Sequence, residues 1–302
     1  MTPCTSASKE LAEPLAATAA TARTWLLLEQ PGPWGAKAFT SSRLDPELGR
    51  ALEGRAHGTE VRLALIRQPG REGGGLRIPQ RRVFVAHTVP GASWIREASV
   101  ADPRELLGLD FAALGRGEHG AFGSVYGGPP LALVCTNGKR DRCCALLGRP
   151  LAAELVASGH GQVWEVTHLG GHRFSPTMLV LPYGYAYGRL DPGTAKEVLD
   201  ATSEGRMVLS GCRGRSTWQR SGQAAELAVR KLIGEEFANA IAVSPAVEWG
   251  VGCWTMEVTH TDGRVWTVTI EQQLSGPPRP ESCGTVLGTP ARMVVSSVRE
   301  AE

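Results

Sequence analysis

The sequence predicts an α/β protein made of more than one domain. Its 302 residues exceed the roughly 100 to 200 that one domain usually takes. Hydrophobic residues make up 42% of the chain and charged residues 21%, as in ordinary globular proteins. From residue 131 onward the expected elements run strand, helix, strand, strand, strand, helix. A strand–helix–strand unit gives a parallel pair and a hairpin gives an antiparallel edge, so we expect a mixed sheet.

The first part of the chain divides into a terminus, a domain and a connection. Residues 1–22 are small and polar and predict a flexible amino terminus. Residues 23–115 predict an amino-terminal α/β domain, in which the Gly- and Pro-rich stretch 67–81 is a loop. The glycine-rich stretch 103–124 lacks periodicity and predicts the connection to the next domain. Apolar runs predict strands of the first domain at 25–28, 60–66 and 82–87.

The clearest pattern lies in residues 125–203. The order of elements there is that of a thioredoxin-like fold, which we therefore predict for this segment. Residues 204–302 predict a carboxy-terminal extension, with a helix at 222–237, a β-hairpin around the turn at 261–263 and a last strand at 293–298, packed on the other domains. No internal repeat of fixed period is evident. The elements expected in the central segment are strands at 131–134, 162–166, 178–181 and 185–187 and helices at 145–158 and 194–202.

The charge balance identifies no binding partner. Lys and Arg number 32 and Asp and Glu 30, and a net charge of +2 predicts no nucleic-acid-binding surface. No apolar run is long enough to span a bilayer, so no membrane association is expected. The Ala-rich start lacks the basic-then-apolar order of a signal peptide. Clustered Cys and His without an export signal predict a cytoplasmic protein.

Two pairs of metal-binding side chains follow buried strands. Cys135 and Cys144 bracket the loop after the strand at 131–134, and His168 and His172 follow the strand at 162–166. Because neighbouring parallel strands end at the same edge of a sheet, the four side chains should lie together. Two thiolates and two imidazoles hold either a tetrahedral zinc ion or a [2Fe-2S] cluster. The cysteines are further apart than in most structural zinc sites, which favours the larger cluster.

Several motifs resemble the sucrase/ferredoxin-like family, relatives of the thioredoxin-like [2Fe-2S] ferredoxins. The resemblance implies that Cys135 and Cys144 bind one iron and that His168 and His172 bind the other. The spacing C-x8-C selects Cys144, but the adjacent Cys143 leaves that choice open. The motifs that carry the resemblance are C-T-N-G-K-R-D-R-C-C at 135–144, W-E-V-T-H-L-G-G-H-R-F at 164–174, L-V-L-P at 179–182, W-L-L-L-E-Q-P-G-P-W-G at 25–35, R-G-R-S at 213–216 and Q-A-A-E at 223–226.

These features predict an electron-transfer protein that exchanges electrons with a redox partner protein. Two neutral imidazoles in place of two thiolates make the cluster less negative, so its potential should exceed that of an all-cysteine ferredoxin by on the order of hundreds of millivolts. The second ring nitrogen of each histidine can couple electron uptake to proton uptake. The alternatives are a structural Cys2His2 zinc protein and a hydrolase whose active site is unrecognised, for which no carboxylate pair stands out.

The remaining signals are weaker. Lys139, Arg140 and Arg142 form a basic run that either docks an acidic partner or is solvated surface. Gly170 and Gly171 are expected to let the backbone turn tightly between the two histidines. The other cysteines show no partner spacing and are expected to be idle thiols, although one of them lies in a Pro-rich loop and is a candidate reactive thiol. These are Cys4, Cys212, Cys253 and Cys283, of which Cys283 is the loop residue.

Overall fold

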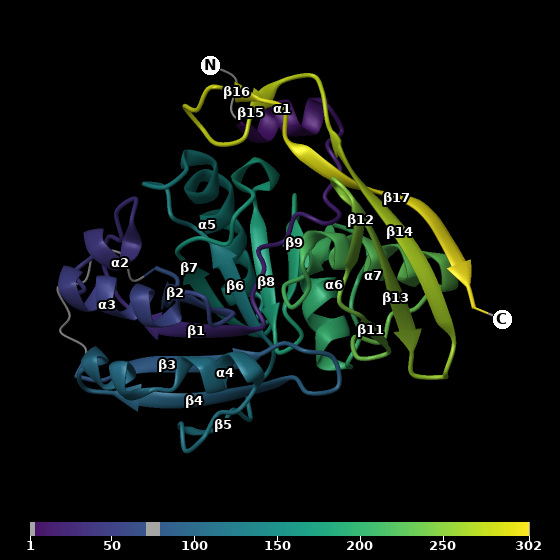
Figure 1. Cartoon of the computed structure of the whole chain (residues 1–302). Coiled ribbons are helices and arrows are strands. Elements are labelled where there is room, and N and C mark those ends of the chain that lie inside the picture. Colours follow the sequence, from purple (N-terminus) through teal and green to yellow (C-terminus); the bar gives the residue numbers. More distant parts are fainter. Residues whose placement is uncertain (1–3, 71–78, 302) are drawn as a thin grey trace.

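A ten-stranded mixed sheet forms the spine of the first 215 residues. The structure is a computed structural model that describes residues 4–70 and 79–301, and Figure 1 shows it whole. The seven strands expected in this sheet appear with their ends displaced by no more than one residue. The strands are β1 (Thr24–Glu29), β2 (Val61–Arg67), β3 (Arg81–His87), β4 (Trp94–Val100), β5 (Ser124–Val125), β6 (Leu131–Cys135), β7 (Gln162–Val166), β8 (Thr177–Leu181), β9 (Tyr185–Gly188) and β10 (Cys212–Arg215), in the sheet order β10-β9-β8-β6-β7-β2-β1-β3-β4-β5.

The two halves of this sheet repeat one topology. β1 and β2 are parallel and β3 pairs antiparallel with β1, just as β6 and β7 are parallel and β8 pairs antiparallel with β6. β4 and β9 then complete the two hairpins. The first half runs from β1 to β4 and the second from β6 to β9, and no fixed period in the sequence reveals this duplication. Connecting helices are α2 (Ala38–Ser41) and α3 (Pro46–Ala56) in the first half, and α5 (Arg142–Ala157) and α6 (Pro192–Ser203) in the second.

Each half carries its helices on one face and packs its other face against the other half. Side chains of α3 form a core with Leu26 and Leu28 of β1, whereas Leu27 belongs to a core shared with β6, β7 and β8. Phe84 and Trp164, one from each half, meet there with ring centroids 5.7 Å apart. The strands of the first half run across Figure 1 and those of the second run up it, so the sheet turns where the halves join. Burial on both faces explains why these strands read as continuous apolar runs.

The halves join through two residue pairs of β2 and β7. Ile66 pairs with Val166, and Arg67 pairs with Glu165. The Arg67 guanidinium and the Glu165 carboxylate form a buried ion pair, 2.6 Å from Nη2 to Oε2. Thr136, one residue past β6, donates its hydroxyl to the same Oε2 at 2.9 Å. The joint therefore lies directly beneath the loops that follow β6 and β7.

The stretch 103–124 is not a free connection. It contains a 3-10 helix, η1 (Pro103–Gly108), and a helix, α4 (Phe111–Arg116), each capped by an Asp side chain. Leu106, Phe111 and Leu114 belong to the core of the first half. The glycines of this stretch interrupt the helical periodicity of the sequence, so these short helices were not predicted. The loop expected at 67–81 falls largely on residues 71–78, outside the described residues.

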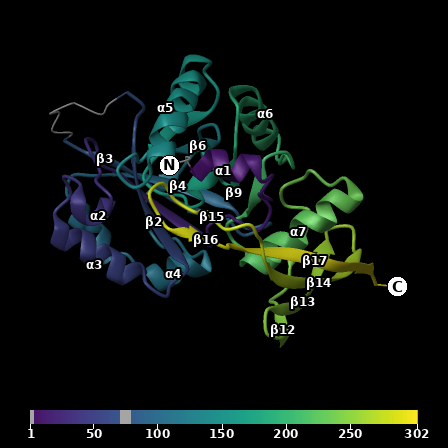
Figure 2. The same cartoon turned by 90° about the horizontal axis from the view of Figure 1, so that it is seen from above.

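The carboxy-terminal part adds a helix and a second sheet. The helix α7 (Arg220–Ile233) packs on this sheet through Ala225 and Val229. The expected hairpin is present, and the last strand pairs with its second arm. Figure 2 shows this sheet beside the spine, on the side away from α3. Its strands are β11 (Ile241–Val243), β12 (Val247–Gly250), β13 (Cys253–His260), β14 (Val265–Leu274) and β17 (Ala291–Glu300).

The amino-terminal helix and the segment between β14 and β17 meet over one edge of the spine. The segment expected to be a flexible terminus contains the helix α1 (Cys4–Glu10), whose Cys4 and Ser8 are fully buried. A small ladder of β15 (Arg279–Pro280) and β16 (Leu287–Gly288) lies against α1, as Figure 1 shows at the top of the view. Arg279 and Arg173 both pair with the buried Glu13. Ordering of the terminus thus depends on contacts that are remote in sequence.

We predict that the Arg67–Glu165 pair is essential to the joint between the halves. Glu165→Gln removes the negative charge that faces the buried Arg67 guanidinium across the joint, which should lower the free energy of unfolding by about 3–5 kcal/mol. The matched control is Glu154→Gln, because Glu154 pairs with Lys196 at the surface, where a salt bridge contributes little. Urea denaturation of the two variants measures the difference, and equal midpoints would contradict the role given to this pair.

Candidate metal site at the ends of β6 and β7

The register of two parallel strands places the first cysteine beside the histidine loop. Cys135 is the last residue of β6 and pairs with Val166, the last residue of β7. His168 follows two residues later, and the Cys135 thiol lies 3.6 Å from the carbonyl oxygen of Thr167. Cys135 is fully buried, on the side of the sheet that faces the core shared by both halves. The expected meeting of the cysteine and histidine loops is therefore what the structure shows.

The start of α5 directs its two neighbouring cysteines differently. Asp141 caps the helix by accepting a hydrogen bond from the amide of Cys143 at 2.9 Å. The Sγ atom of Cys144 lies 3.3 Å from Nδ1 of His172, and Cys144 joins the same core as Cys135. The Sγ atom of Cys143 instead lies 3.7 Å from that of Cys4. Of the two candidates that the sequence left open, the structure places Cys144 at the His172 side.

Close packing of α5 against β6 depends on a glycine. A Cβ atom on Gly148 would lie 2.2 Å from the carbonyl oxygen of Cys135. The absence of a side chain at this position lets the helix approach the end of the strand. The cysteines at the start of α5 are thereby held close to the end of β6.

The histidine loop turns through two glycines in the left-handed conformation. Gly170 has φ +75° and Gly171 has φ +70°. The turn brings the rings of His168 and His172 into a stack with centroids 4.5 Å apart. The buried Arg213 guanidinium supports it by donating to the carbonyl oxygen of Gly170 at 3.0 Å. Both imidazoles are thus presented to the cysteines from one side.

The pKa values of Cys135 and His172 are shifted toward the forms that bind a metal, whereas that of Cys144 is shifted the other way. The thiol of Cys144 lowers the pKa of Cys135 well below its ordinary value, against the effect of burial. Interaction with Cys135 and burial raise the pKa of Cys144 in turn. Burial, together with the neighbouring His168, lowers the pKa of His172, which keeps its ring neutral at pH 7. A thiolate and a neutral imidazole are the forms that bind a metal ion.

One polar atom of the site has no protein partner. Nδ1 of His168 is buried and makes no hydrogen bond with the described residues. An unpaired polar atom in the interior is costly unless something outside the protein satisfies it. With two thiols and a second imidazole beside it, this nitrogen belongs to a donor set that fits a metal centre. The residues present therefore fit the group that the sequence predicts.

A basic groove opens beside the histidines. It has a volume of about 730 Å³ and lies between α2, α3 and the loops after β6 and β7. His168 is the member of the four-residue set that lines it. The groove therefore gives solvent or a partner access to this side of the site. Its charged residues are Lys37, Arg50, Arg62 and Arg140, with Glu53 as the acidic member.

A second group of cysteines, which the sequence did not predict, lies next to the first. The Sγ atoms of Cys4 and Cys283 are 3.6 Å apart, and those of Cys143 and Cys283 are 3.1 Å apart. Cys4 is buried, in keeping with the expectation of a buried or idle thiol, and Cys283 lies beside it although the two show no partner spacing in the sequence. The sequence offers no spacing that would predict this group, because its cysteines are 139 or more residues apart. Cys212 and Cys253 lie outside both groups.

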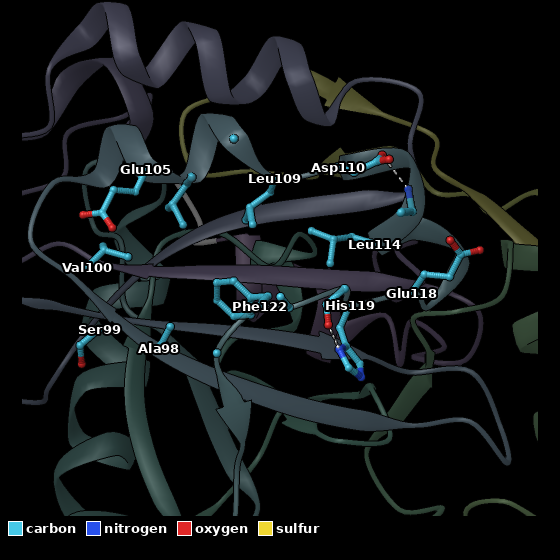
Figure 3. A pocket seen from close by; sticks show the side chains of 16 residues that line it. Ala98, Ser99, Val100, Glu105, Leu109, Asp110, Leu114, Glu118, His119 and Phe122 are labelled. Carbon is cyan, nitrogen blue, oxygen red and sulfur yellow. Dashed lines mark hydrogen bonds between the residues drawn. The ribbon is translucent and has the colours of Figure 1, made fainter.

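The carboxylates around another pocket do not form a hydrolase site. Figure 3 shows this pocket, of about 510 Å³, between β4, η1 and α4. Glu105 and Asp110 cap η1 and α4, and Glu118 pairs with Arg116. Glu105 and Glu118 lie at opposite ends of the pocket (Figure 3). Each carboxylate thus has a local structural role, which gives the hydrolase alternative no support here.

We predict that Gly171 is more sensitive to substitution than Gly170. Alanine at either position costs about 1–2 kcal/mol of backbone strain. At Gly171 its Cβ would also lie 2.2 Å from Nη2 of the buried Arg213, whereas at Gly170 it would meet open space. Gly171→Ala should therefore lose more bound metal and more unfolding free energy than Gly170→Ala. Metal analysis and urea denaturation measure both, and equal losses would argue against the role of Arg213.

The comparisons with known proteins agree with the motifs. A short stretch is 27% identical over 89 residues to a protein of Meyerozyma guilliermondii called "Altered inheritance of mitochondria protein 32", covering 26% of this chain and 32% of that one. The chain thus spans about a third of the length of this relative. No solved structure is significantly similar. Within the described residues, every helix is too short or too polar to cross a bilayer.

A family model gives the broader assignment. The model described as "Sucrase/ferredoxin-like" matches residues 15–214, about two thirds of the chain. The matched region contains the ten-stranded sheet except for Arg215, the last residue of β10, and ends before α7 and the second sheet. It also contains Cys135, Cys144, His168 and His172. The chain belongs to the sucrase/ferredoxin-like family.

Proposed function

We propose that this chain is a cytoplasmic electron-transfer protein that holds a [2Fe-2S] cluster in its second, thioredoxin-like half. Cys135, Cys144, His168 and His172 would be the ligands. The observation that carries the proposal is the convergence of these two thiols and two imidazoles at one edge of the sheet. When bound, such a cluster accepts and returns one electron. All seven cysteines are free thiols, as suits a reducing compartment.

The surrounding residues would hold the ligands and balance their charge. Burial of Cys135 and Cys144 excludes water from the sulfur side. Arg213 brings a cation close to both thiols. Burial lowers its pKa to about 10, so the guanidinium is still charged at neutral pH. A buried cation beside two thiolates lowers the cost of keeping them ionised.

One distance favours a second candidate, a structural zinc site on the same residues. Around a tetrahedral zinc ion, Zn–S and Zn–N bonds of about 2.3 and 2.0–2.1 Å place sulfur and nitrogen roughly 3.6 Å apart. The Cys144 Sγ and His172 Nδ1 atoms are 3.3 Å apart. This separation suits a single ion. The wide C-x8-C loop and the family membership favour the cluster.

Spectroscopy of the purified protein separates the two candidates. Protein with a [2Fe-2S] cluster should be red-brown and give, when reduced, an electron paramagnetic resonance signal of the Rieske type. Cys144→Ser should abolish the colour, and Cys143→Ser should keep it, because Cys143 faces the other group. A colourless wild-type protein that holds zinc lost in Cys144→Ser would establish the zinc site instead.

We further propose that the redox partner approaches through the basic groove. His168 is the ligand that lines this groove, and four cationic residues surround it with one acidic residue. A positive surface of this kind attracts an anionic partner and speeds its association at low salt. Arg140 lies at the exposed rim, in the loop that leads from Cys135 to α5.

The groove can be tested with ferricyanide, a small anionic oxidant. Arg140→Glu should slow oxidation of the reduced protein by several-fold, roughly, at low ionic strength, with the difference shrinking as salt is added. Lys231→Glu is the matched control, since Lys231 is exposed on α7 and makes the same charge change away from the groove. Stopped-flow absorbance gives both rates. Equal slowing in the two variants would mean that net charge, and not the groove, sets the rate.

A further inference from the structure

Three cysteines from three distant segments converge beside the start of α5. Cys4 comes from α1, Cys143 from the first turn of α5, and Cys283 from the loop between β15 and β16. The sulfur of Cys4 lies 3.7 Å from that of Cys143 and 3.6 Å from that of Cys283, and the sulfurs of Cys143 and Cys283 lie 3.1 Å apart. A carboxylate oxygen of Asp141 lies 3.8 Å from the sulfur of Cys4. All four side chains place a ligand atom within 4.8 Å of the others.

We propose that Cys4, Cys143, Cys283 and Asp141 form a second metal site, which binds a zinc ion. Zn–S bonds of about 2.3 Å in a tetrahedron place sulfur atoms roughly 3.8 Å apart, and sulfur and oxygen roughly 3.6 Å apart. The separations involving Cys4 are close to these values. Three thiolates and a carboxylate favour zinc among the common cations, because soft sulfur donors exclude calcium and magnesium. The donor set is complete without a water molecule.

The carboxylate of Asp141 is already oriented by its neighbours. Oδ1 accepts the amide hydrogen of Cys143 at 2.9 Å, and Oδ2 accepts from the Ser282 hydroxyl and the Cys283 amide, each at 2.8 Å. Oδ2 thereby uses both of its lone pairs, whereas Oδ1 accepts one bond and keeps a second lone pair, so Oδ1 is the oxygen that is free to bind a metal. Hydrogen bonds that fix ligand orientation are typical of metal sites. The amino-terminal end of α5 also favours the negative charge of the ligands.

Such a site would fasten the amino-terminal helix and the β15–β16 loop to the start of α5. Cys4 lies 139 residues before Cys143, and Cys283 lies 140 residues after it. The ion pairs of Glu13 with Arg173 and Arg279 reinforce the same contact. Because Cys143 adjoins Cys144, ordering this cluster would also fix the start of α5 beside the first site. Its role is therefore structural.

Metal analysis of the full-length protein tests this inference. The wild type should contain one zinc per chain that Cys144→Ser does not remove. Cys4→Ser and Cys283→Ser should each lose that zinc while keeping the metal of the first site and its absorption spectrum. Cys253→Ser should lose nothing, since Cys253 lies outside both groups. This pattern distinguishes the second site from the proposed electron-transfer site, whichever metal the latter holds.

The role of Asp141, the fourth proposed ligand, is tested by comparing a variant at Asp141 with a control variant at Asp191. Asp141→Asn should give up zinc to a chelator at least tenfold faster than Asp191→Asn, roughly the effect of losing an oriented ligand. Asp191 caps α6 in the same way that Asp141 caps α5, but no cysteine surrounds it. Equal rates would remove the carboxylate from the site.

Two results would overturn the inference outright. One is a wild-type protein without this zinc, or one whose zinc survives both cysteine substitutions. The other is a Cys143–Cys283 disulfide, found by peptide mass mapping of freshly purified protein. If these two serine variants fail to fold, X-ray absorption at the zinc edge of Cys144→Ser, which lacks a metal in the first site, decides. It should find a shell of three sulfurs and one oxygen, and any shell without three sulfurs contradicts the assignment.

Discussion

The parallel pairing of β6 with β7 is the constraint on which the site depends. Two adjacent parallel strands must end at the same edge of a sheet, and a helix that connects them must begin at that edge. This geometry brings together the last residue of β6, the first turn of α5 and the loop after β7. Cys135, Cys144, His168 and His172 occupy these three places. The strand order alone therefore brings these four residues together, without a rearrangement of flexible loops.

The duplicated topology explains how a site of this kind is enclosed. Each half leaves one face of its sheet without helices, and the halves bury these faces against each other. Cys135 and Cys144 belong to this shared core, so their sulfur atoms are shielded by both halves. The helices α2 and α3 of the first half then wall the groove that reaches His168. The first half thus contributes surroundings for a site whose four residues come from the second.

Adjacent cysteines at the start of a helix acquire separate environments. Consecutive residues on a helix point in directions about 100° apart, so Cys143 and Cys144 cannot face the same neighbours. Cys144 faces the core and His172, whereas Cys143 faces α1 and the β15–β16 loop. The first turn of α5 therefore contributes one cysteine to each of two groups, Cys144 to the group with His172 and Cys143 to the group with Cys4 and Cys283. Asp141 lies between them, with ligand atoms near those of both groups.

The sequence by itself determined what depends on near neighbours along the chain. Apolar runs located seven strands of the large sheet to within a residue but missed β4, β5 and β10, and the element order of 131–203 predicted which loops share an edge. The pairs Cys135 and Cys144, and His168 and His172, were identified because each pair lies within ten residues. The adjacent cysteines could not be told apart by spacing, since only the rotation of α5 distinguishes them.

Only the tertiary structure decided what depends on distant contacts. The grouping of Cys4 with Cys143 and Cys283, the place of Arg213 behind Gly170 and Gly171, and the joint between β2 and β7 all unite residues far apart in the chain. No periodicity or spacing records such contacts. The amino terminus shows the reason most plainly: its small polar residues have no strong folding preference of their own, and α1 is ordered by the surface on which it packs.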